Sequence, residues 1–239
     1  MRFPVLIHLG PWTVDPHVFF VLLGYAAGVA LFLRLRRREG DPIGRTQRWI
    51  VVAAALIGSA LGARALAWPD GKTIVGGMIG GLIAVELVKW RIGVRSRTGD
   101  LFALPLCVGI AIGRLGCFLE GLGDATYGNP TSLFTGVDFG DGIPRHPTQL
   151  YESAFVLLLA AFVIVTRERF AKAGDRFRLF MVSYMSFRLL VDFIKPEPRV
   201  AMGLSVIQWA CVATLLYYAA DARKGYIWEP CSQPPTPPP

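Results

Sequence analysis

Charged residues are scarce in this chain. Asp, Glu, Lys and Arg make up 18% of its 239 residues, whereas globular chains average about 25%. Hydrophobic residues reach 53%, and the mean hydropathy is +0.46. This balance excludes a disordered protein, a collagen-like fibre and a chain whose basic tail binds nucleic acid. The formal net charge is nevertheless +8, so the positions of the cations carry information.

Cysteine is also scarce. Cys107, Cys117 and Cys211 lie in or at the ends of apolar stretches, and Cys231 lies in a Pro-rich tail. Their spacing gives neither a disulfide framework nor a metal-ligand pattern, so we expect structural thiols, no metal and no other cofactor. The chain also has no Walker phosphate-binding motif, which disfavours a nucleotide-driven pump.

Seven apolar stretches approach the length of a membrane span, which needs about 20 mostly apolar residues. They are residues 18–33, 50–68, 73–88, 101–119, 153–166, 177–194 and 204–220. A buried globular helix is the alternative for any one of them. Seven in succession, separated by short polar connections, favour an all-α integral membrane protein with seven transmembrane helices.

The cations predict the topology, because cytoplasmic loops carry an excess of Lys and Arg. Sixteen fall after the first, third and fifth stretches and in the tail, and five fall on the other side. This alternation predicts an N-terminus outside the membrane and a C-terminus in the cytoplasm. The residues before the first stretch lack a basic segment and a cleavage site, so that stretch is expected to be an uncleaved anchor.

The connections divide the chain into a membrane domain and a tail. Residues 1–222 form the predicted membrane domain. Within it, residues at about 120–152 form a long external loop between helices four and five, and a structured loop of this length is usually functional. Residues 223–239 form a cytoplasmic Pro-rich tail that we expect to be extended and disordered.

Four arginines lie inside the predicted spans, where an ionisable group indicates function by default. Arg178 lies at a basic end and can extend to the surface. Counting along the spans places Arg64, Arg114 and Arg188 near their outer ends, at one depth. Asp192 shares a helix face with Arg188, because residues i and i+4 are neighbours.

Two interpretations of these charges remain open. Arg188 and Asp192 can form a buried pair that neutralises itself. Asp192 can neutralise only one arginine, however, and Glu86 lies too close to the inner end, so Arg114 and Arg64 still require anions. A cationic pocket at the depth of the outer leaflet suits the phosphate of an anionic phospholipid, because guanidinium groups match phosphate oxygens.

Three segments resemble the signature of the prolipoprotein diacylglyceryl transferase family. Residues 113–121 (GRLGCFLEG) lead to Tyr127-Gly128, as in the family's first motif. Residues 145–152 (RHPTQLYE) are similar to the family's RHPSQLYE, and residues 187–193 (FRLLVDF) to its FRxxxEF. Arg64 lies where the family has Gly-Gly-Arg. The likeness covers about residues 18–220 and includes the seven-span topology.

The resemblance implies a multi-pass enzyme of the bacterial inner membrane. Such an enzyme moves diacylglyceryl from phosphatidylglycerol to the cysteine thiol of a prolipoprotein signal sequence and releases glycerol 1-phosphate. The implied partners are phosphatidylglycerol, the signal sequence and the lipid bilayer, without nucleic acid. Arg114 matches the family's lipid-binding arginine and Arg188 a second essential one. Cations can stabilise the departing phosphate, and a base must produce the thiolate nucleophile.

The expected site follows from these segments. Catalytic roles are expected for His146, Arg188, Asp192 and Glu152. Substrate-binding roles are expected for Arg114, Arg64, Arg145, Gln149, Tyr151, Glu120 and Gly128.

Several positions depart from the family pattern. The family's His-Gly-Gly histidine is Val75 here, its signature asparagine is Cys117, its next asparagine is Glu120, and its first-span tyrosine aligns with about Phe19. Each change removes or alters a polar group close to the expected site. The functional alternative is therefore a divergent paralogue that binds anionic phospholipid and modifies another acceptor, or only binds or moves lipid.

The departures leave the base to be identified. His146 is the first choice, because a histidine titrates near neutral pH without a large shift. Glu152 and Glu120 are the alternatives. His146 can instead be a positioning residue that hydrogen-bonds the loop.

Overall fold

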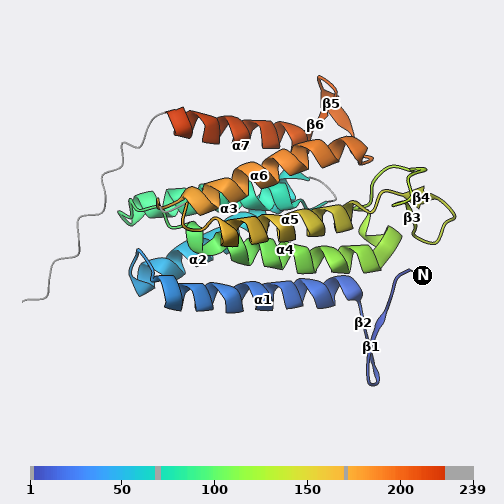
Figure 1. Cartoon of the computed structure of the whole chain (residues 1–239), viewed down its shortest axis with the longest axis horizontal. Helices are drawn as coiled ribbons and strands as arrows, with labels where there is room; N and C mark the ends of the chain where they lie inside the picture. The colour runs from blue at the N-terminus through green and yellow to red at the C-terminus, as the bar shows by residue number, and fades with distance from the viewer. Residues whose placement is uncertain (1–2, 68–70, 170–171, 224–239) are drawn as a thin grey trace, which may run out of the picture.

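The computed structural model describes residues 3–67, 71–169 and 172–223, which form a mostly helical bundle (Figure 1). Each of the predicted stretches overlaps one α-helix. The helices are α1 (Pro16–Glu39), α2 (Arg45–Leu66), α3 (Ile74–Arg91), α4 (Asp100–Glu120), α5 (Thr148–Val165), α6 (Asp175–Val191) and α7 (Val206–Arg223). By length and composition, α1, α2, α4 and α5 can cross a membrane. Cys231 and the expected tail beyond Arg223 lie outside the described residues.

Helix α5 begins earlier than the sequence predicts. Its first residue is Thr148 rather than Ser153, so Gln149, Tyr151 and Glu152 lie on the helix and not in the external loop. Pro147 precedes the helix, and its carbonyl accepts the N–H groups of the first turn. The apolar pattern alone missed this turn because it contains polar side chains. The loop between α4 and α5 therefore covers residues 121–147 and begins with a 3₁₀ turn, η1 (Gly121–Asp124).

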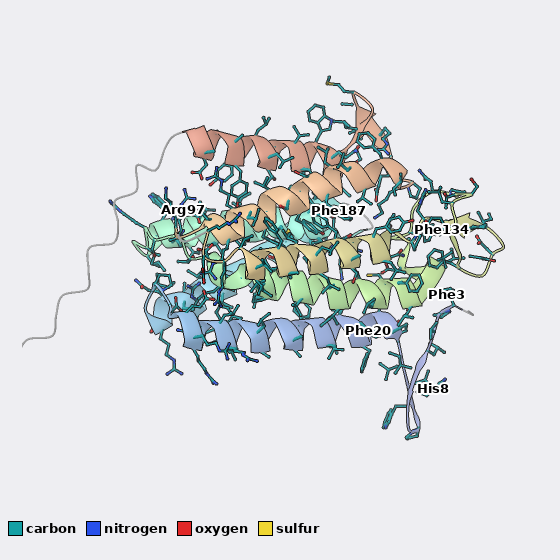
Figure 2. The ribbon with its side chains drawn as sticks, viewed as in Figure 1. Phe3, His8, Phe20, Arg97, Phe134 and Phe187 are labelled. Atoms are coloured by element: carbon teal, nitrogen blue, oxygen red, sulfur yellow. The ribbon has the colours of Figure 1, made fainter. Side chains whose placement is uncertain are left out.

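Three short antiparallel hairpins, which the sequence analysis did not predict, lie in the described residues. They are β1 (Ile7–Leu9) with β2 (Trp12–Val14), β3 (Val137–Asp138) with β4 (Pro144–Arg145), and β5 (Arg199–Ala201) with β6 (Leu204–Ser205). All three lie at the end of the bundle where the N-terminus lies, opposite the α1–α2 connection (Figure 1). Phe3, His8 and Phe134 mark this end in Figure 2. We call it the hairpin end, and the opposite end the basic end.

Helices α4, α5 and α6 supply much of the hydrophobic core. Cys107, Val156 and Phe180 are among its fully buried side chains, each with an exposed fraction of 0%. The outer faces are apolar as well: Leu61 of α2 is 68% exposed and Leu158 of α5 is 72% exposed. Many exposed large hydrophobic side chains are typical of a surface that contacts another apolar phase. It agrees with a bundle that is surrounded by lipid.

Helices α2 and α3 approach each other through glycines. A β-carbon added at Gly58 or Gly62 of α2, or at Gly76 or Gly80 of α3, would come closer than 3.0 Å to backbone atoms of the facing helix. Small residues allow such close backbone contact in membrane bundles. Gly76 and Gly80 of α3 therefore face Gly58 and Gly62 of α2 at close range.

We expect Gly80→Ala to destabilise the bundle by about 1–3 kcal/mol, the usual cost of added volume in a packed interface. The new methyl would meet the Gly58 carbonyl and the Gly62 backbone, which cannot rotate away. Gly113→Ala is the control, because no atom lies within 4 Å of the added carbon. The measurement is the loss of helical circular dichroism in a denaturing detergent titration. Equal stability of the two variants would contradict the packing described.

Candidate active site

Glu152 stands between two arginines in the interior of the bundle. Its Oε2 lies 2.9 Å from Nη2 of Arg114 on α4 and 3.0 Å from Nη1 of Arg188 on α6. The hydroxyl of Tyr184 donates to Oε1 at 2.5 Å. Glu152 is only 2% exposed, so the prediction that it lies outside the spans is wrong. The expectation that Arg114 has no anion within the chain is also wrong, because the first turns of α5 bring Glu152 to it.

Neighbouring contacts hold the three helices around this cluster. The hydroxyl of Ser153, next to Glu152, donates to the carbonyl of Ala111 on α4 at 3.0 Å. The rings of Phe155 on α5 and Phe187 on α6 are stacked, with centroids 4.3 Å apart, and Figure 2 labels Phe187 in the middle of the bundle. Each contact involves a residue close to a member of the cluster. The spacing of Arg114, Glu152 and Arg188 is therefore set by packing on both sides.

Asp192 is the predicted partner of Arg188, but it lies farther from Arg188 than Glu152 does. The distance from Nη2 of Arg188 to Oδ1 of Asp192 is 3.5 Å, although Asp192 is fully buried. The hydroxyl of Ser205 donates to its Oδ2 at 2.5 Å, and the backbone N–H of Gln208 donates to Ser205 Oγ. Asp192 thus connects the end of α6 to the start of α7, and its second oxygen forms a longer ion pair with Arg188.

Several buried polar atoms at or near the cluster have no hydrogen-bond partner among the described residues. Nε of Arg114, Nε of Arg188 and both amide atoms of Gln149 are buried and have no hydrogen-bond partner in the described part of the chain. Gln149 is 1% exposed and lies one turn before Glu152 on α5. Buried polar groups are normally paired, so unpaired N–H groups beside two arginines fit a site that receives an oxygen-rich ligand.

Lys195 adds a third cation that the sequence analysis did not select. It follows the 3₁₀ turn η2 (Asp192–Ile194) and is 6% exposed. Burial, together with the guanidinium groups of Arg188 and Arg114, lowers the pKa of Lys195 to about 8. With Lys195 protonated, its positive charge and those of the two arginines outnumber the negative charges of Glu152 and Asp192. The net charge of the cluster then favours an anion.

His146 lies in the segment before α5 and has a hydroxyl partner. Its Nδ1 is 3.3 Å from the hydroxyl of Tyr151, which is 2.8 Å from Oγ1 of Thr135. The backbone N–H of Gly128 donates to the His146 carbonyl at 2.8 Å. A β-carbon at Gly128 would come closer than 3.0 Å to His146 and to the Ile194 carbonyl. Gly128 therefore lets the loop pass close to the end of α6.

Two of the predicted site arginines are held or exposed elsewhere. Arg145 forms an ion pair with Asp141 in the external loop at 2.7 Å, and its guanidinium lies 5.1 Å from the Tyr127 ring. Arg64 is exposed on α2. Within the described ranges neither has an ion pair or hydrogen bond to Arg114, Glu152 or Arg188. The sequence analysis places Arg64 at the same depth as Arg114 and Arg188, but Arg64 is not part of the buried cluster.

Beside the cluster lies a second polar group that links α1 to η1. Nδ1 of His17 is 3.0 Å from Oδ1 of Asp124 and 3.7 Å from Sγ of Cys117, and Nη1 of Arg114 is 3.8 Å from the same sulfur. The ligand atoms of His17, Cys117 and Asp124 lie within 4.8 Å of one another, so these three side chains could hold a metal ion. Glu120 interacts electrostatically with His17 and Asp124, so it belongs to this group rather than pairing with Arg114.

Some of the residues missed by the sequence analysis had a detectable signal. Tyr184 precedes Arg188 by four residues, which places it on the same helix face. Lys195 follows Asp192 closely, just beyond the predicted span. His17 and Asp124 had no such signal, because residues far apart in the sequence meet only through the packing of α1 on α4. Gly116 permits that packing, since a β-carbon there would contact Pro16 and His17 of α1.

Comparison with known proteins identifies the family. The family model described as prolipoprotein diacylglyceryl transferase matches residues 4–220. Three relatives carry the name phosphatidylglycerol–prolipoprotein diacylglyceryl transferase. The protein of Nitratidesulfovibrio vulgaris is 33% identical over 241 residues, covering 89% of this chain and 88% of its own. That of Geobacter sulfurreducens is 31% identical, covering 84% and 85%. That of Bordetella bronchiseptica is 30% identical, covering 89% and 91%. The chain belongs to the prolipoprotein diacylglyceryl transferase family.

Proposed function

We propose that this chain transfers the diacylglyceryl group of phosphatidylglycerol to the cysteine thiol of a prolipoprotein signal sequence. The names of its relatives state phosphatidylglycerol, a prolipoprotein and transfer of a diacylglyceryl group. The observation that carries the proposal is the buried carboxylate of Glu152 between Arg114 and Arg188. The Nε atoms of both arginines have no hydrogen-bond partner among the described residues. This arrangement has donors and net charge suited to a lipid phosphate.

The cluster supports binding of the donor lipid through its phosphate. Glu152 fixes the positions of Arg114 and Arg188 before the lipid arrives, so little side-chain entropy is lost on binding. Their remaining N–H groups, and the ammonium of Lys195, are available to phosphate oxygens. Gln149 is buried one turn before Glu152 on α5, and its amide can donate to the glycerol phosphate. Asp192 and Tyr184 act through the arginines and Glu152, as positioning residues.

The reaction is a displacement at carbon. The thiolate sulfur attacks the carbon of the diacylglyceryl group that carries the phosphate. A C–S bond forms there, and the bond between that carbon and the phosphate oxygen breaks. The bonding electron pair leaves with the oxygen, which departs as glycerol 1-phosphate. Negative charge grows on the phosphate in the transition state, and fixed cations such as Arg114 and Arg188 stabilise it there.

His146 is the base that we propose for the thiol proton. In the tautomer that donates Nδ1–H to the Tyr151 hydroxyl, Nε2 is left as an acceptor. Glu152 suits this role less well, because its two oxygens already accept from Arg114, Arg188 and Tyr184. In this chain the histidine of the family's third-span motif is replaced by Val75, which is buried in the hydrophobic core.

We further propose that all seven helices span the bacterial inner membrane, with the hairpin end outside. Helices α1, α2, α4 and α5 have the length and composition for this. The positions of Lys and Arg in the connections favour an outer N-terminus and a cytoplasmic C-terminus. Residues 1–222 then form the membrane domain, residues 121–147 its external loop, and residues 223–239 its cytoplasmic tail.

The proposed activity is tested with purified full-length protein, phosphatidylglycerol and a signal peptide that contains the acceptor cysteine. We expect a thioether-linked diacylglyceryl peptide by mass spectrometry and one glycerol 1-phosphate for each product. His146→Ala should lower turnover by about 100- to 10,000-fold, the usual contribution of a positioned acid or base. Its affinity for phosphatidylglycerol should not change.

A cysteine-to-serine signal peptide is the control for thiol transfer. Lipid binding without any product from the unaltered protein would favour a lipid-binding paralogue over a transferase. Full turnover by His146→Ala would remove His146 as the base. The same assay on His17→Gln would then show whether the His17–Asp124 pair takes the thiol proton instead.

Arg114→Ala should weaken binding of phosphatidylglycerol by about 10- to 100-fold. A hydrogen bond to a charged group contributes about 1.5–3 kcal/mol, and 1.4 kcal/mol corresponds to a factor of ten. The fold should persist, because Glu152 keeps Arg188 and Tyr184 as partners. The control is Arg178→Ala, at the other end of the bundle. Unchanged lipid affinity in Arg114→Ala would leave Arg114 with a structural role only.

Binding of phosphatidylglycerol should weaken as the pH rises through about 8. Below its pKa of about 8, Lys195 is charged and attracts the phosphate, and above it Lys195 is neutral. A bound phosphate favours the charged form of Lys195, so the pKa of Lys195 is higher in the complex than in the free protein. The affinity falls as the pH rises from the lower of these two pKa values to the higher one. Lys195→Arg should remove this pH dependence, because arginine stays charged. The same pH dependence in the variant would exclude Lys195 as its source.

A further inference from the structure

A cavity opens at the basic end of the bundle, between the last turns of α1, the start of α4 and the last turns of α5. Its volume is about 250 Å³. Leu35 of α1, Leu104 of α4 and Ile164 of α5 line its apolar part. A second cavity of about 500 Å³ lies on the adjoining surface of α1, where Arg34, Arg37 and Arg38 line it. Both cavities therefore share the end of α1.

Arginines from three helical regions surround the first cavity. They are Arg34 and Arg38 at the end of α1, Arg167 after α5, and Arg176 at the start of α6. Glu39 is the only acidic residue among those lining it, and it pairs with Arg176 at 2.7 Å. Arg34, Arg38 and Arg167 have no ion pair within the described residues. The lining therefore has an excess of three positive charges.

Elsewhere at the basic end, several cations that are not fully exposed have carboxylate partners. Arg36 and Arg48 both pair with Asp41, at 2.7 and 2.6 Å, and Arg97 pairs with Asp221 at 3.1 Å, where Figure 2 labels it. Part of the charge at the end of α1 offsets the negative end of the helix dipole. The end of α5 favours Arg167 in the same way. The helix dipole does not favour Arg176, however, because it lies in the first turn of α6.

We propose that this cavity binds one anionic phospholipid from the membrane leaflet at the basic end. The arginines match a phosphate group, and the apolar wall formed by Leu35, Leu104 and Ile164 matches the start of an acyl chain. A free phosphate would use only the first of these features, so the combination favours a lipid. Basic pockets between membrane helices on the cytoplasmic side bind anionic headgroups in this way.

This lipid site is distinct from the proposed donor site. Glu152 and Ile164 both lie on α5, separated by 12 residues, and a helix rises about 1.5 Å per residue. The two positions are therefore about 18 Å apart along the helix, more than half of a hydrocarbon core of about 30 Å. A lipid with its phosphate near Arg34 and Arg167 cannot place the same phosphate near Arg114.

The test uses the full-length protein in detergent and phosphatidylserine, an anionic lipid that is not the proposed donor. Native mass spectrometry counts the lipids bound at each concentration. The triple variant Arg34→Gln, Arg38→Gln and Arg167→Gln should weaken the binding of one phosphatidylserine by about 100-fold. Each cation near an anionic headgroup contributes about one kcal/mol, and about 1.4 kcal/mol corresponds to a factor of ten.

A matched variant separates this site from general attraction to a basic surface. Arg45→Gln, Arg91→Gln and Arg95→Gln remove the same charge from exposed positions that do not line the cavity. We expect that variant to keep the affinity of the unaltered protein for phosphatidylserine. Phosphatidylcholine, which has no net charge, and glycerol phosphate, which has no acyl chains, should each bind weakly.

Two results would overturn the proposal. An equal loss of affinity in both triple variants would reduce the effect to unspecific electrostatics. Glycerol phosphate that competes as well as the intact lipid would replace the lipid with a free anion. Because no step depends on transferase activity, the outcome is independent of whether the chain transfers diacylglyceryl.

Discussion

The interaction on which the site depends is the contact of one buried carboxylate, that of Glu152, with the guanidinium groups of Arg114 and Arg188. Each arginine alone in the bundle interior would be an uncompensated buried charge, and removing one partner from a buried ion pair typically costs about 3–5 kcal/mol. Glu152 contacts both arginines, and Asp192 supplies a second negative charge. The cluster is still cationic when Lys195 is protonated. Glu152 therefore lowers the free-energy cost of burying the two arginines, and the remaining positive charge of the cluster favours anions.

Because two arginines share one carboxylate, three helices must meet at fixed distances. Arg114 comes from α4, Glu152 from α5 and Arg188 from α6, and the stacked rings of Phe155 and Phe187 join the last two near these residues. Asp192 extends the network to Ser205 and Gln208 at the start of α7. A change in the register of α6 would separate Arg188 from both of its anions. The polar network thus specifies the helix register that apolar packing alone leaves loosely defined.

The sequence predicted the helices well and the polar partners poorly, for reasons that are physical. Apolar stretches of nearly membrane-spanning length located all seven helices, and the helix periodicity placed Arg188 beside Asp192. Glu152 was assigned to the loop because hydropathy cannot distinguish a polar first turn from a polar connection. The contact of His17 with Asp124 depends on how closely α1 packs on Gly116, which is a three-dimensional property. The short hairpins at Gly10 and Gly203 carry too few residues for a periodic signal.

Buried and exposed arginines of the bundle are compensated in different ways, and desolvation explains the difference. Arg114 and Arg188 are buried to 7% and 3% exposure, so they need carboxylates within the chain before any ligand arrives. Arg34, Arg38 and Arg167 are exposed, and solvent or a headgroup can compensate them. A carboxylate beside these three exposed arginines would weaken their attraction to an anionic leaflet without lowering a burial cost. Burial of Arg114 and Arg188 therefore requires the nearby carboxylates of Glu152 and Asp192. The exposed arginines around the cavity at the basic end have no burial cost of this kind and need no acidic partner.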